Sequence, residues 1–296
     1  MSKPKIAVIG IPGKWSTEVL ADAVEEKTGF RLVLDMNQLS ADLNTGQLMA
    51  GEFSLNDVNG IIVKKISQIY SPNTLDRIEL LRIAEQQGIR VFSKAEKIIR
   101  MIDRLSCTVT LRNGDIPMPA TTVAEDVAAA LAAIKEYGTA VLKPLYSTKA
   151  QGMSLISADQ SKAEIIKQIE AFKNENPMMY IQKKLDLQGQ DYGMVFLGGK
   201  YLGSYARVSQ GETWNTTINS GGKYAAYEPD DSIIALAQKA QDLFELDFTT
   251  VDVAETDQGA IIFEVSAFGG FKGALEGAGI NAADLYANYV ISELEK

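Results

Sequence analysis

The sequence predicts a parallel α/β domain followed by two α+β parts, and three observations lead to this expectation. Strand and helix patterns alternate as far as about residue 93, which is typical of a parallel sheet covered by helices. Beyond residue 190, two hairpin patterns surround Gly198-Gly199 and Asp257-Gln258-Gly259. The 296 residues are 46% apolar and 23% charged, so the chain can bury a sizeable core.

Residues 1–94 form the first expected part, in which short apolar runs alternate with helical stretches. The apolar runs predict strands at Lys5–Gly10, Arg31–Leu34, Val58–Val63 and Ile89–Phe92. The stretches between them predict helices at Thr17–Lys27 and Pro72–Gln87.

Residues 95–182 and 183–296 form the second and third parts, and we expect a cleft between them. In the second part, the sequence pattern predicts helices at Ala95–Thr110, Asp126–Lys135 and Lys162–Asn174. It predicts strands at Ala140–Pro144, Met153–Ser157 and Met179–Gln182. Pro117 and Pro119 predict an extended segment. The third part predicts hairpins at 192–208 and 249–265, and helices at Asp231–Phe244 and Asn281–Glu295.

Histidine is absent and Cys107 is the single cysteine, which excludes several kinds of site. No Ser-His-Asp or Cys-His hydrolase, no zinc site built on histidine or thiolates, and no iron–sulfur cluster fits this composition. The chemistry must use Lys, Arg, Asp, Glu, hydroxyls, backbone amides and magnesium, which suits phosphoryl transfer. One cysteine also fits a reducing compartment, so we expect a cytoplasmic protein.

Charge and hydropathy narrow the range of partners. A net charge of −9 argues against a general affinity for nucleic acid. The apolar runs have the length of strands, so no membrane span is expected. Met1-Ser2-Lys3-Pro4 leads directly into a strand, and we therefore expect no signal peptide.

Two carboxylates interrupt the apolar strands of the last hairpin pattern. Asp252 lies within Val251-Asp252-Val253, and Glu264 lies within Phe263-Glu264-Val265. A carboxylate inside an apolar strand is costly unless it is paired or binds a cation. Two of them facing one cleft suit magnesium, although two half-exposed residues pointing to solvent would give the same pattern.

A lysine ends the apolar strand 140–144 and precedes a loop rich in small residues at 145–153. Lys143 is placed to reach an α- or β-phosphate, and the backbone N–H groups of the loop are placed to close over phosphate oxygens. Further along, Gln182, Lys183 and Leu185 leave a strand into a connector whose backbone suits an adenine edge. Asp191 would then orient the lysine or support the metal region. A solvated lysine and a solvated charged connector are the alternatives.

Arg207 ends a strand of the first hairpin and is followed by a loop that runs to Gly221-Gly222. Near a nucleotide, its guanidinium would neutralise charge that develops on a transferred phosphoryl group. A surface arginine is the alternative. The glycine pair suits a backbone turn or an anion-binding nest.

Taken in chain order, the motifs around Lys143, residues 182–191, Arg207 and the hairpin with Asp252 and Glu264 resemble those of the ATP-grasp superfamily. Within it, they resemble the RimK-like carboxylate–amine ligases. The resemblance covers nearly the whole chain and rests on the ordered set, since no single piece is specific. It implies an ATP-grasp fold preceded by a small parallel α/β domain, with ATP held between two α+β lobes. It also places Arg104 at the helix position of a phosphate-binding lysine, and Gln182, Lys183, Leu185 and Asp191 around the nucleotide.

The same resemblance implies the reaction and its cofactors. Mg²⁺, with Mn²⁺ as an alternative ion, would bind Asp252, Glu264 and Ser266, while Lys143 and Arg207 would serve catalysis. A small-molecule or peptide carboxylate would form an acyl-phosphate, and an amine such as that of glutamate would displace the phosphate. Assembly into a homo-oligomer stays open.

Three departures from the family pattern leave other functions open. Arg104 replaces a lysine, Ser266 replaces an asparagine metal ligand, and the tail 266–271 lacks Asn-x-Ser-Pro-Gly. A nucleotide-binding regulatory module with weak or lost turnover would show such changes. An ATP-grasp kinase that phosphorylates a small molecule is the remaining alternative. Phe268 and Phe271 in the tail are interpreted as core residues or as a substrate wall.

Overall fold

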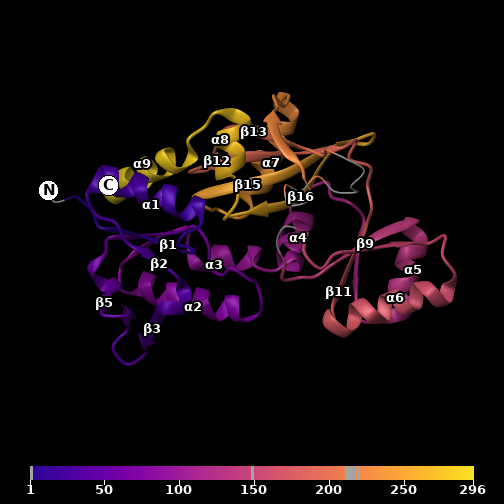
Figure 1. The fold of residues 1–296 in the computed structure, drawn as a ribbon, viewed down its shortest axis with the longest axis horizontal. Coiled ribbons are helices and arrows are strands. Elements are labelled where there is room, and N and C mark those ends of the chain that lie inside the picture. The colour runs from indigo at the N-terminus through magenta and orange to yellow at the C-terminus, as the bar shows by residue number, and fades with distance from the viewer. Residues whose placement is uncertain (1–2, 148–149, 211–215, 217, 219–220) are drawn as a thin grey trace.

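Four β-sheets organise the computed structural model, which describes residues 3–147, 150–210, 216, 218 and 221–296. In the described residues, the strand orders are β2-β1-β6-β7, β10-β9-β11-β8, β14-β13-β12-β15-β16 and β3-β4-β5. Figure 1 shows the first sheet and the second at opposite ends of the long axis, with the strands of the third between them. The expected parallel sheet in the N-terminal region and the expected antiparallel sheet in the C-terminal region are confirmed, and the sheet between them along the chain is antiparallel as well.

The N-terminal sheet is parallel and its central strands are buried on both faces. It consists of β1 (Ile6–Ile9), β2 (Val33–Leu34), β6 (Gly60–Val63) and β7 (Arg90–Phe92). Every residue of β1 and β6 is buried, which explains why these strands are continuously apolar rather than alternating. Two helices, α1 (Trp15–Thr28) and α2 (Asn73–Gln86), connect the strands.

A small antiparallel sheet between β2 and β6 was not predicted. It consists of β3 (Leu39–Asp42), β4 (Gln47–Ala50) and β5 (Phe53–Ser54), flanked by the 3-10 turns η1 (Met36–Gln38) and η2 (Leu55–Asp57). These strands are two to four residues long and mostly half-buried or exposed. Such short strands carry too little apolar alternation to be recognised in the sequence.

The single helix expected at 95–110 is wrong, because the chain breaks at Asp103. The structure contains α3 (Ala95–Ile98), the 3-10 turn η3 (Ile99–Met101) and α4 (Arg104–Asn113). Asp103 has extended backbone angles, and its side chain accepts a hydrogen bond of 2.7 Å from Ser106 N. An aspartate that caps a new helix in this way competes with continuation of the previous one.

The second sheet carries two helices on one side. It contains β8 (Thr121–Ala124), β9 (Thr139–Lys143), β10 (Ser154–Ser157) and β11 (Met179–Lys183), with helices α5 (Val127–Tyr137) and α6 (Lys162–Glu175). The apolar faces of α5 and α6 form one core with this sheet. The extended segment predicted around the prolines leads into β8, which is an edge strand.

The third sheet is antiparallel and is covered by the remaining helices. It contains β12 (Gln190–Leu197), β13 (Lys200–Val208), β14 (Lys223–Ala226), β15 (Phe248–Thr256) and β16 (Gly259–Ser266). Its helices are α7 (Asp231–Asp242), α8 (Phe271–Ala278) and α9 (Ala282–Leu294). We did not predict β14 and α8, since their sequences are short and α8 contains glycines at 273 and 277.

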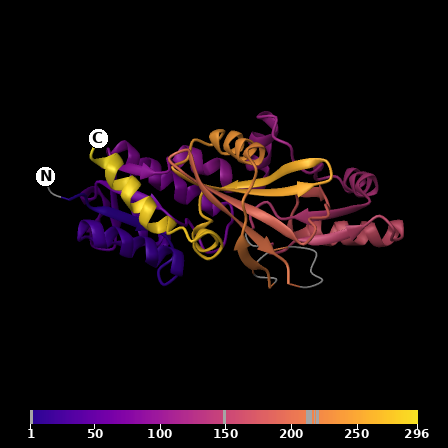
Figure 2. The same cartoon turned by 90° about the horizontal axis from the view of Figure 1, so that it is seen from above.

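The C-terminal helix returns to the N-terminal sheet. Residues of α9 share a core with α1 and β1, and Figure 2 shows the yellow helix lying along the indigo N-terminal region. The cores of the first and third parts are therefore joined. The boundaries at 94 and 182 stay a prediction.

Candidate active site

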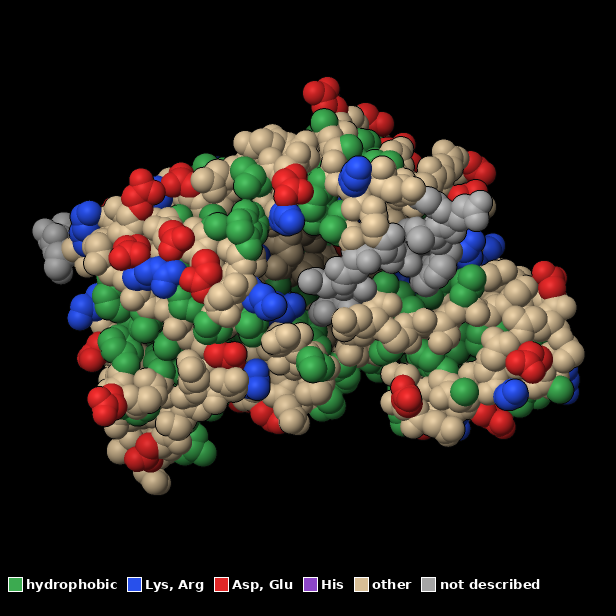
Figure 3. All heavy atoms as spheres, in the orientation of Figure 1, with side chains coloured by type: hydrophobic (Ala, Val, Ile, Leu, Met, Phe, Trp, Pro, Cys, Tyr) green, Lys and Arg blue, Asp and Glu red, His purple; other side chains and the backbone are tan. Residues whose placement is uncertain are grey.

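A cavity of about 730 Å³ lies where the three parts meet. It is lined by the second and third sheets, as expected, and also by residues of the N-terminal part, among them Lys14, Trp15, Lys64, Lys65 and Tyr70. Figure 3 shows the hollow near the middle of one face, with Lys or Arg side chains at its rim. The cavity therefore extends further toward the N-terminus than the sequence predicted.

The two strand carboxylates lie opposite each other at this cavity. Asp252 of β15 pairs in register with Glu264 of β16, and a β-bulge follows directly after Asp252. Burial raises the pKa of the Asp252 carboxyl, the Arg207 guanidinium lowers it, and the nearby Glu264 carboxylate raises it again. A carboxyl whose ionisation is opposed by burial and by a neighbouring carboxylate favours a bound cation beside it.

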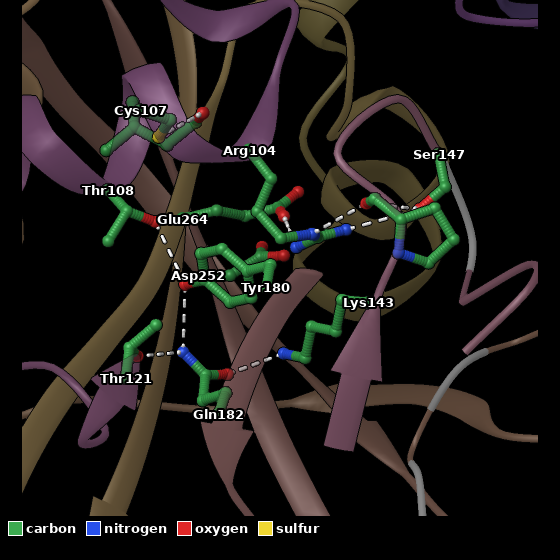
Figure 4. A network of polar contacts seen from close by, with 12 residues as sticks. Arg104, Cys107, Thr108, Thr121, Lys143, Ser147, Tyr180, Gln182, Asp252 and Glu264 are labelled. Atoms are coloured by element: carbon green, nitrogen blue, oxygen red, sulfur yellow. Dashed lines mark hydrogen bonds and ion pairs between the residues drawn. The ribbon is translucent and has the colours of Figure 1, made fainter. Parts of the chain in front are cut away.

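Each carboxylate has an arginine partner. Arg104 Nη1 lies 3.2 Å from Glu264 Oε2, and the same guanidinium donates to Pro144 O at 3.4 Å. Figure 4 shows Arg104 between Glu264 and Ser147. Because α4 begins at Arg104, the break in the predicted helix is what points this side chain into the cavity.

Arg207 joins two acidic residues. Its Nη2 lies 3.1 Å from Asp252 Oδ1, and its guanidinium also pairs with Asp191. Thr216 donates to Asp191 Oδ1 at 2.5 Å. Burial lowers the pKa of Arg207, but Asp252 and Asp191 raise it well above its ordinary value, so the arginine stays charged. Of the two roles expected for Asp191, support of the metal region agrees with this geometry, and orientation of the lysine does not.

Lys143 is oriented by Gln182. Its Nζ donates to Gln182 Oε1 at 2.6 Å, while Gln182 Nε2 donates to Thr121 Oγ1 and Tyr180 Oη at 3.1 Å each (Figure 4). The Tyr180 hydroxyl shares a hydrogen bond of 2.9 Å with Thr108. Burial lowers the pKa of Lys143 to about 7, and Arg104 lowers it while Glu264 raises it. The lysine is half-buried beside the cavity and hydrogen-bonded to a buried amide, so it is not a solvated surface residue.

The connector after β11 also lines the cavity, through Lys183, Lys184 and Leu185. The backbone N–H groups of Lys183 and Lys184 donate to Ala120 O and Thr139 O. Those two donors serve the sheet, so an adenine edge has to use other groups of this connector.

Parts of two predicted loops lie outside the described residues. These are residues 148–149 of the loop at 145–153, and residues 215, 217, 219 and 220 of the loop at 215–222. Among the described residues, Ser147 and Ala150 on one side and Thr216 and Ile218 on the other line the cavity.

The tail after β16 is a turn followed by α8. Phe271 is buried in the core, where its ring meets Phe248 edge-on, while Phe268 is half-buried against Tyr70. Both rings also line the cavity, so this tail combines core packing with a wall of the cavity.

Sequence reasoning did not identify four groups at the site. Lys64 donates from Nζ to Phe268 O at 2.8 Å and Gly269 O at 3.2 Å, and lies 3.8 Å from the Phe271 ring centre. Thr108, Tyr180 and Thr250 were not named. Alternation along β11 places Tyr180 on the same face as Gln182, a signal that was available in the sequence.

The residues fit one magnesium ion. The described chain contains no group of three or more His, Cys, Asp or Glu placed to hold a metal, so protein ligands would be the carboxylate pair and hydroxyls. Ser266 lies two residues after Glu264 on β16, with its hydroxyl accepting from Phe268 N at 3.3 Å. Magnesium commonly takes one or two carboxylates plus phosphate oxygens, which agrees with this donor set.

Residues 101–290 match the model of the RimK-like ATP-grasp domain. The chain belongs to this family. It is 25% identical over 321 residues to tetrahydromethanopterin:alpha-L-glutamate ligase of Methanosarcina acetivorans, covering 98% of this chain and 99% of that one. The resemblance found in the sequence is thereby confirmed.

Solved structures show the same fold. An ATP-grasp RimK domain protein from Sphaerobacter thermophilus has a TM-score of 0.74 and 21% identity, covering 96% of this chain and 98% of that one. The ATP-grasp ligase PsnB, complexed with a precursor variant, Mg and ADP, has a TM-score of 0.76 at 14% identity and covers all of both chains. The expected ATP-grasp fold is confirmed. No helix in the described ranges is long and apolar enough to cross a membrane.

Proposed function

We propose that the cavity binds ATP and joins a carboxylate to an amine through an acyl-phosphate. The chain is an ATP-dependent carboxylate–amine ligase, as its family and its likeness to named glutamate ligases indicate. The observation that carries the site assignment is the register pair Asp252 and Glu264, which shares one cavity with Lys143.

The nucleotide would lie between the second and third sheets. Lys143 and Arg104 are placed to neutralise phosphate oxygens, and Gln182 holds the lysine toward the cavity. The connector with Lys183 and Leu185 would face the base. A lysine kept in place by a buried amide gives a defined position for the phosphate, which is what phosphoryl transfer requires.

Asp252, Glu264 and Ser266 would hold magnesium, with Mn²⁺ as a substitute of similar ligand preference. Bound there, the ion supplies charge neutralisation for the triphosphate. Arg104 pairs with Glu264, and Arg207 with Asp252, so both arginines would stabilise the negative charge that accumulates during transfer. Asp191 would act through Arg207, because its carboxylate is occupied by that side chain.

The proposed reaction has two steps. An oxygen of the substrate carboxylate attacks the γ-phosphorus, and the bond to the β-phosphate oxygen breaks with release of ADP. The amine nitrogen then attacks the acyl carbon, a proton leaves the nitrogen, and inorganic phosphate departs. A small-molecule or peptide carboxylate and an amino acid such as glutamate are the proposed substrates, because relatives are named glutamate ligases.

To test the site, pairs of carboxylates and amines are supplied with ATP. ADP release is measured, and the product is identified by mass spectrometry. We expect amide formation that needs both substrates, and Glu264→Gln or Asp252→Asn should lower turnover at least about a hundredfold. Glu79→Gln is the matched control, since the Glu79 side chain is 51% exposed and, among the described residues, its ion pair is with Arg82 on α2. Turnover of the Glu264→Gln variant equal to that of the original protein would refute the assignment.

The same assay separates the alternatives. Nucleotide binding without ADP formation for any pair would favour a regulatory module, for which the replacement of asparagine by Ser266 gives a reason. A phosphorylated product that forms without an amine would favour a kinase. We also propose a cytoplasmic location and leave the oligomeric state to sedimentation measurements.

A further inference from the structure

The lysine proposed to bind phosphate is held by an amide that has two possible orientations. Lys143 Nζ donates to Gln182 Oε1 at 2.6 Å, and Gln182 is 2% exposed. The two ends of an amide have nearly the same shape, but only the oxygen accepts a hydrogen bond from an ammonium group. With the amide turned over, its NH2 group would face the lysine and repel it. The position of Lys143 therefore depends on the residues that fix the orientation of Gln182.

Thr121 is the first of these residues, because its hydroxyl can only accept from the amide. The Thr121 hydroxyl donates to Pro119 O at 2.9 Å, so its hydrogen is already used. Its oxygen lies 3.1 Å from Gln182 Nε2. An amide oxygen in that place would face the threonine oxygen with no hydrogen between them. Thr121 therefore requires the NH2 group of Gln182 on its side.

Tyr180 supplies the second acceptor. Its hydroxyl oxygen lies 3.1 Å from Gln182 Nε2 and 2.9 Å from Thr108 Oγ1. Because this oxygen accepts from Gln182, the phenol hydrogen is free to point to Thr108. Burial raises the pKa of Tyr180, so the hydroxyl keeps its hydrogen. Tyr180 is 1% exposed and Thr108 is 6% exposed, so bulk water competes little with these partners.

The hydrogen bonds of this network run away from the lysine, as Figure 4 shows for most of its members. The Gln182 amide donates to Thr121 and Tyr180, and both hydroxyls donate onward. Hydrogen bonds aligned in one direction polarise and strengthen one another in a buried setting. A neutral amide also leaves the charge of Lys143 uncancelled, whereas a carboxylate in its place would offset it. The charge is therefore held in one position and stays available to a phosphate.

The same tyrosine connects the lysine to Arg104. Arg104 and Thr108 lie four residues apart on α4, and therefore on one face of the helix. The Tyr180 ring centre lies 5.9 Å from Arg104 Cζ, while its hydroxyl meets Thr108. Arg104 in turn pairs with Glu264. Tyr180 thus fixes Lys143 and Arg104, the two proposed phosphate-binding cations, relative to each other.

Tyr180 and Thr121 act through other residues. The described residues that line the cavity include Lys143 and Gln182, but neither Tyr180 nor Thr121. An effect of these two side chains on a bound nucleotide must therefore pass through the Gln182 amide.

We propose that Tyr180, Thr108 and Thr121 are positioning residues for phosphoryl transfer. They orient the Gln182 amide, and the amide holds Lys143 where a nucleotide phosphate binds. This inference rests on the proposed function, in which Lys143 neutralises phosphate oxygens. Loss of one acceptor frees the amide to turn over, and the lysine then loses its partner although neither Lys143 nor Gln182 has been changed.

The test measures the dissociation constant of ADP with Mg²⁺ by calorimetry on the intact protein. Tyr180→Phe removes one acceptor and should weaken binding at least about fivefold, because the lysine is no longer held. Lys143→Met should weaken binding by a larger factor. In Lys143→Met/Tyr180→Phe, the loss of the tyrosine hydroxyl should add less than about twofold, because the lysine that it positions is gone. A purely structural role of Tyr180 would add the same factor in both backgrounds.

Thr108 gives a second test that leaves the tyrosine in place. Thr108→Val removes the acceptor of the phenol hydrogen, which then favours an amide oxygen beside Tyr180, and ADP binding should weaken at least about threefold. Thr108→Ser keeps the hydroxyl and should recover most of the affinity. Tyr137→Phe is the matched control, since it removes a tyrosine–threonine hydrogen bond of 2.7 Å, to Thr122, away from the cavity lining. It should bind ADP like the original protein.

The proposal is overturned if Tyr180→Phe binds ADP within about twofold of the original protein, or loses the same factor with and without Lys143. It is also overturned if Thr108→Ser binds as weakly as Thr108→Val. Urea unfolding shows which variants are folded, and the two Thr108 variants decide the question if Tyr180→Phe is unfolded. Failure of the original protein to bind ADP and Mg²⁺, or unchanged affinity of Lys143→Met, would instead refute the proposed function, so the two failures are distinguishable.

Discussion

Arg207 of β13 reaches Asp252 of β15 across the strand that separates them. In the sheet, β12 lies between β13 and β15, and the Nη2–Oδ1 distance is 3.1 Å. The residue of β12 opposite Asp252 is Gly193, which has no side chain to block the approach. Arg207 therefore neutralises Asp252 and Asp191 together, and both the stability of this sheet and the charge of the site depend on it.

Arg207→Met should destabilise the fold as well as stop turnover. Both Asp191 and Asp252 would lose their guanidinium partner in a largely buried setting, and breaking such a pair costs about 3–5 kcal/mol. The free energy of unfolding in urea measures the loss. Arg82→Met, which removes an exposed pair with Glu79, should change it by less than about 1 kcal/mol. Equal effects of the two substitutions would contradict the proposed bridging role.

Gly193→Ala should also destabilise the protein. A Cβ at this position would lie 2.3 Å from the ring of Tyr205, which is 3% exposed and cannot easily move. Overpacking of this kind costs about 1–3 kcal/mol. The melting temperature should fall, and the double variant Gly193→Ala/Tyr205→Leu should recover part of this loss. Gly269→Ala is the control, since the nearest atom to its Cβ would be Thr250 Oγ1 at 3.7 Å, an ordinary contact distance.

Nucleotide binding should take up a proton at pH 8 through Lys143. Burial lowers the pKa of this amine to about 7, so at pH 8 most of it is neutral before binding. Phosphate oxygens favour the charged form and raise the pKa, so binding is accompanied by protonation and weakens as pH rises above 7. The decrease is at most about tenfold per pH unit for one proton.

Calorimetry in buffers with different ionisation enthalpies measures this uptake. The variant Lys143→Arg stays charged throughout and should bind nucleotide without the uptake that Lys143 contributes. Lys135→Arg, at an exposed position on α5, should behave like the original protein. An unchanged proton uptake in the Lys143→Arg variant would show that another group is responsible.

The sequence was most informative where a residue type conflicted with its local pattern. Asp252 and Glu264 were recognisable because each carboxylate interrupts an apolar strand. The hairpin turn at 257–259 sets the register near the turn, and the β-bulge after Asp252, which was not predicted, shifts it so that Asp252 lies opposite Glu264. Lys143 was recognisable because it ends a buried strand. In each case, one local rule sufficed to locate the side chain, and the structure places all three at one cavity.

Long-range placement was what the sequence did not provide. Lys64 approaches the Phe268–Gly269 turn from 204 residues away, and the Arg104–Glu264 pair spans 160 residues. The helix break at Asp103 depends on one capping hydrogen bond, which competes with an otherwise continuous helical pattern. Such contacts follow from how the sheets pack, and no periodicity in one segment encodes them.

Thr250→Val should leave the fold at least as stable as before. The substitution removes a buried hydroxyl that has no hydrogen-bond partner among the described residues and keeps the shape of the side chain, so the free energy of unfolding should stay equal or rise by about 1 kcal/mol.

The neighbouring Thr249→Val provides the opposite pattern. The Thr249 hydroxyl donates to Gln241 Oε1 at 3.4 Å, on the other face of β15, so its loss should lower the free energy of unfolding by about 1 kcal/mol. Urea unfolding of both variants gives the two values that are needed. If Thr250→Val lowers the free energy of unfolding as much as Thr249→Val does, the Thr250 hydroxyl stabilises the fold, and the expected difference between the two threonines is wrong.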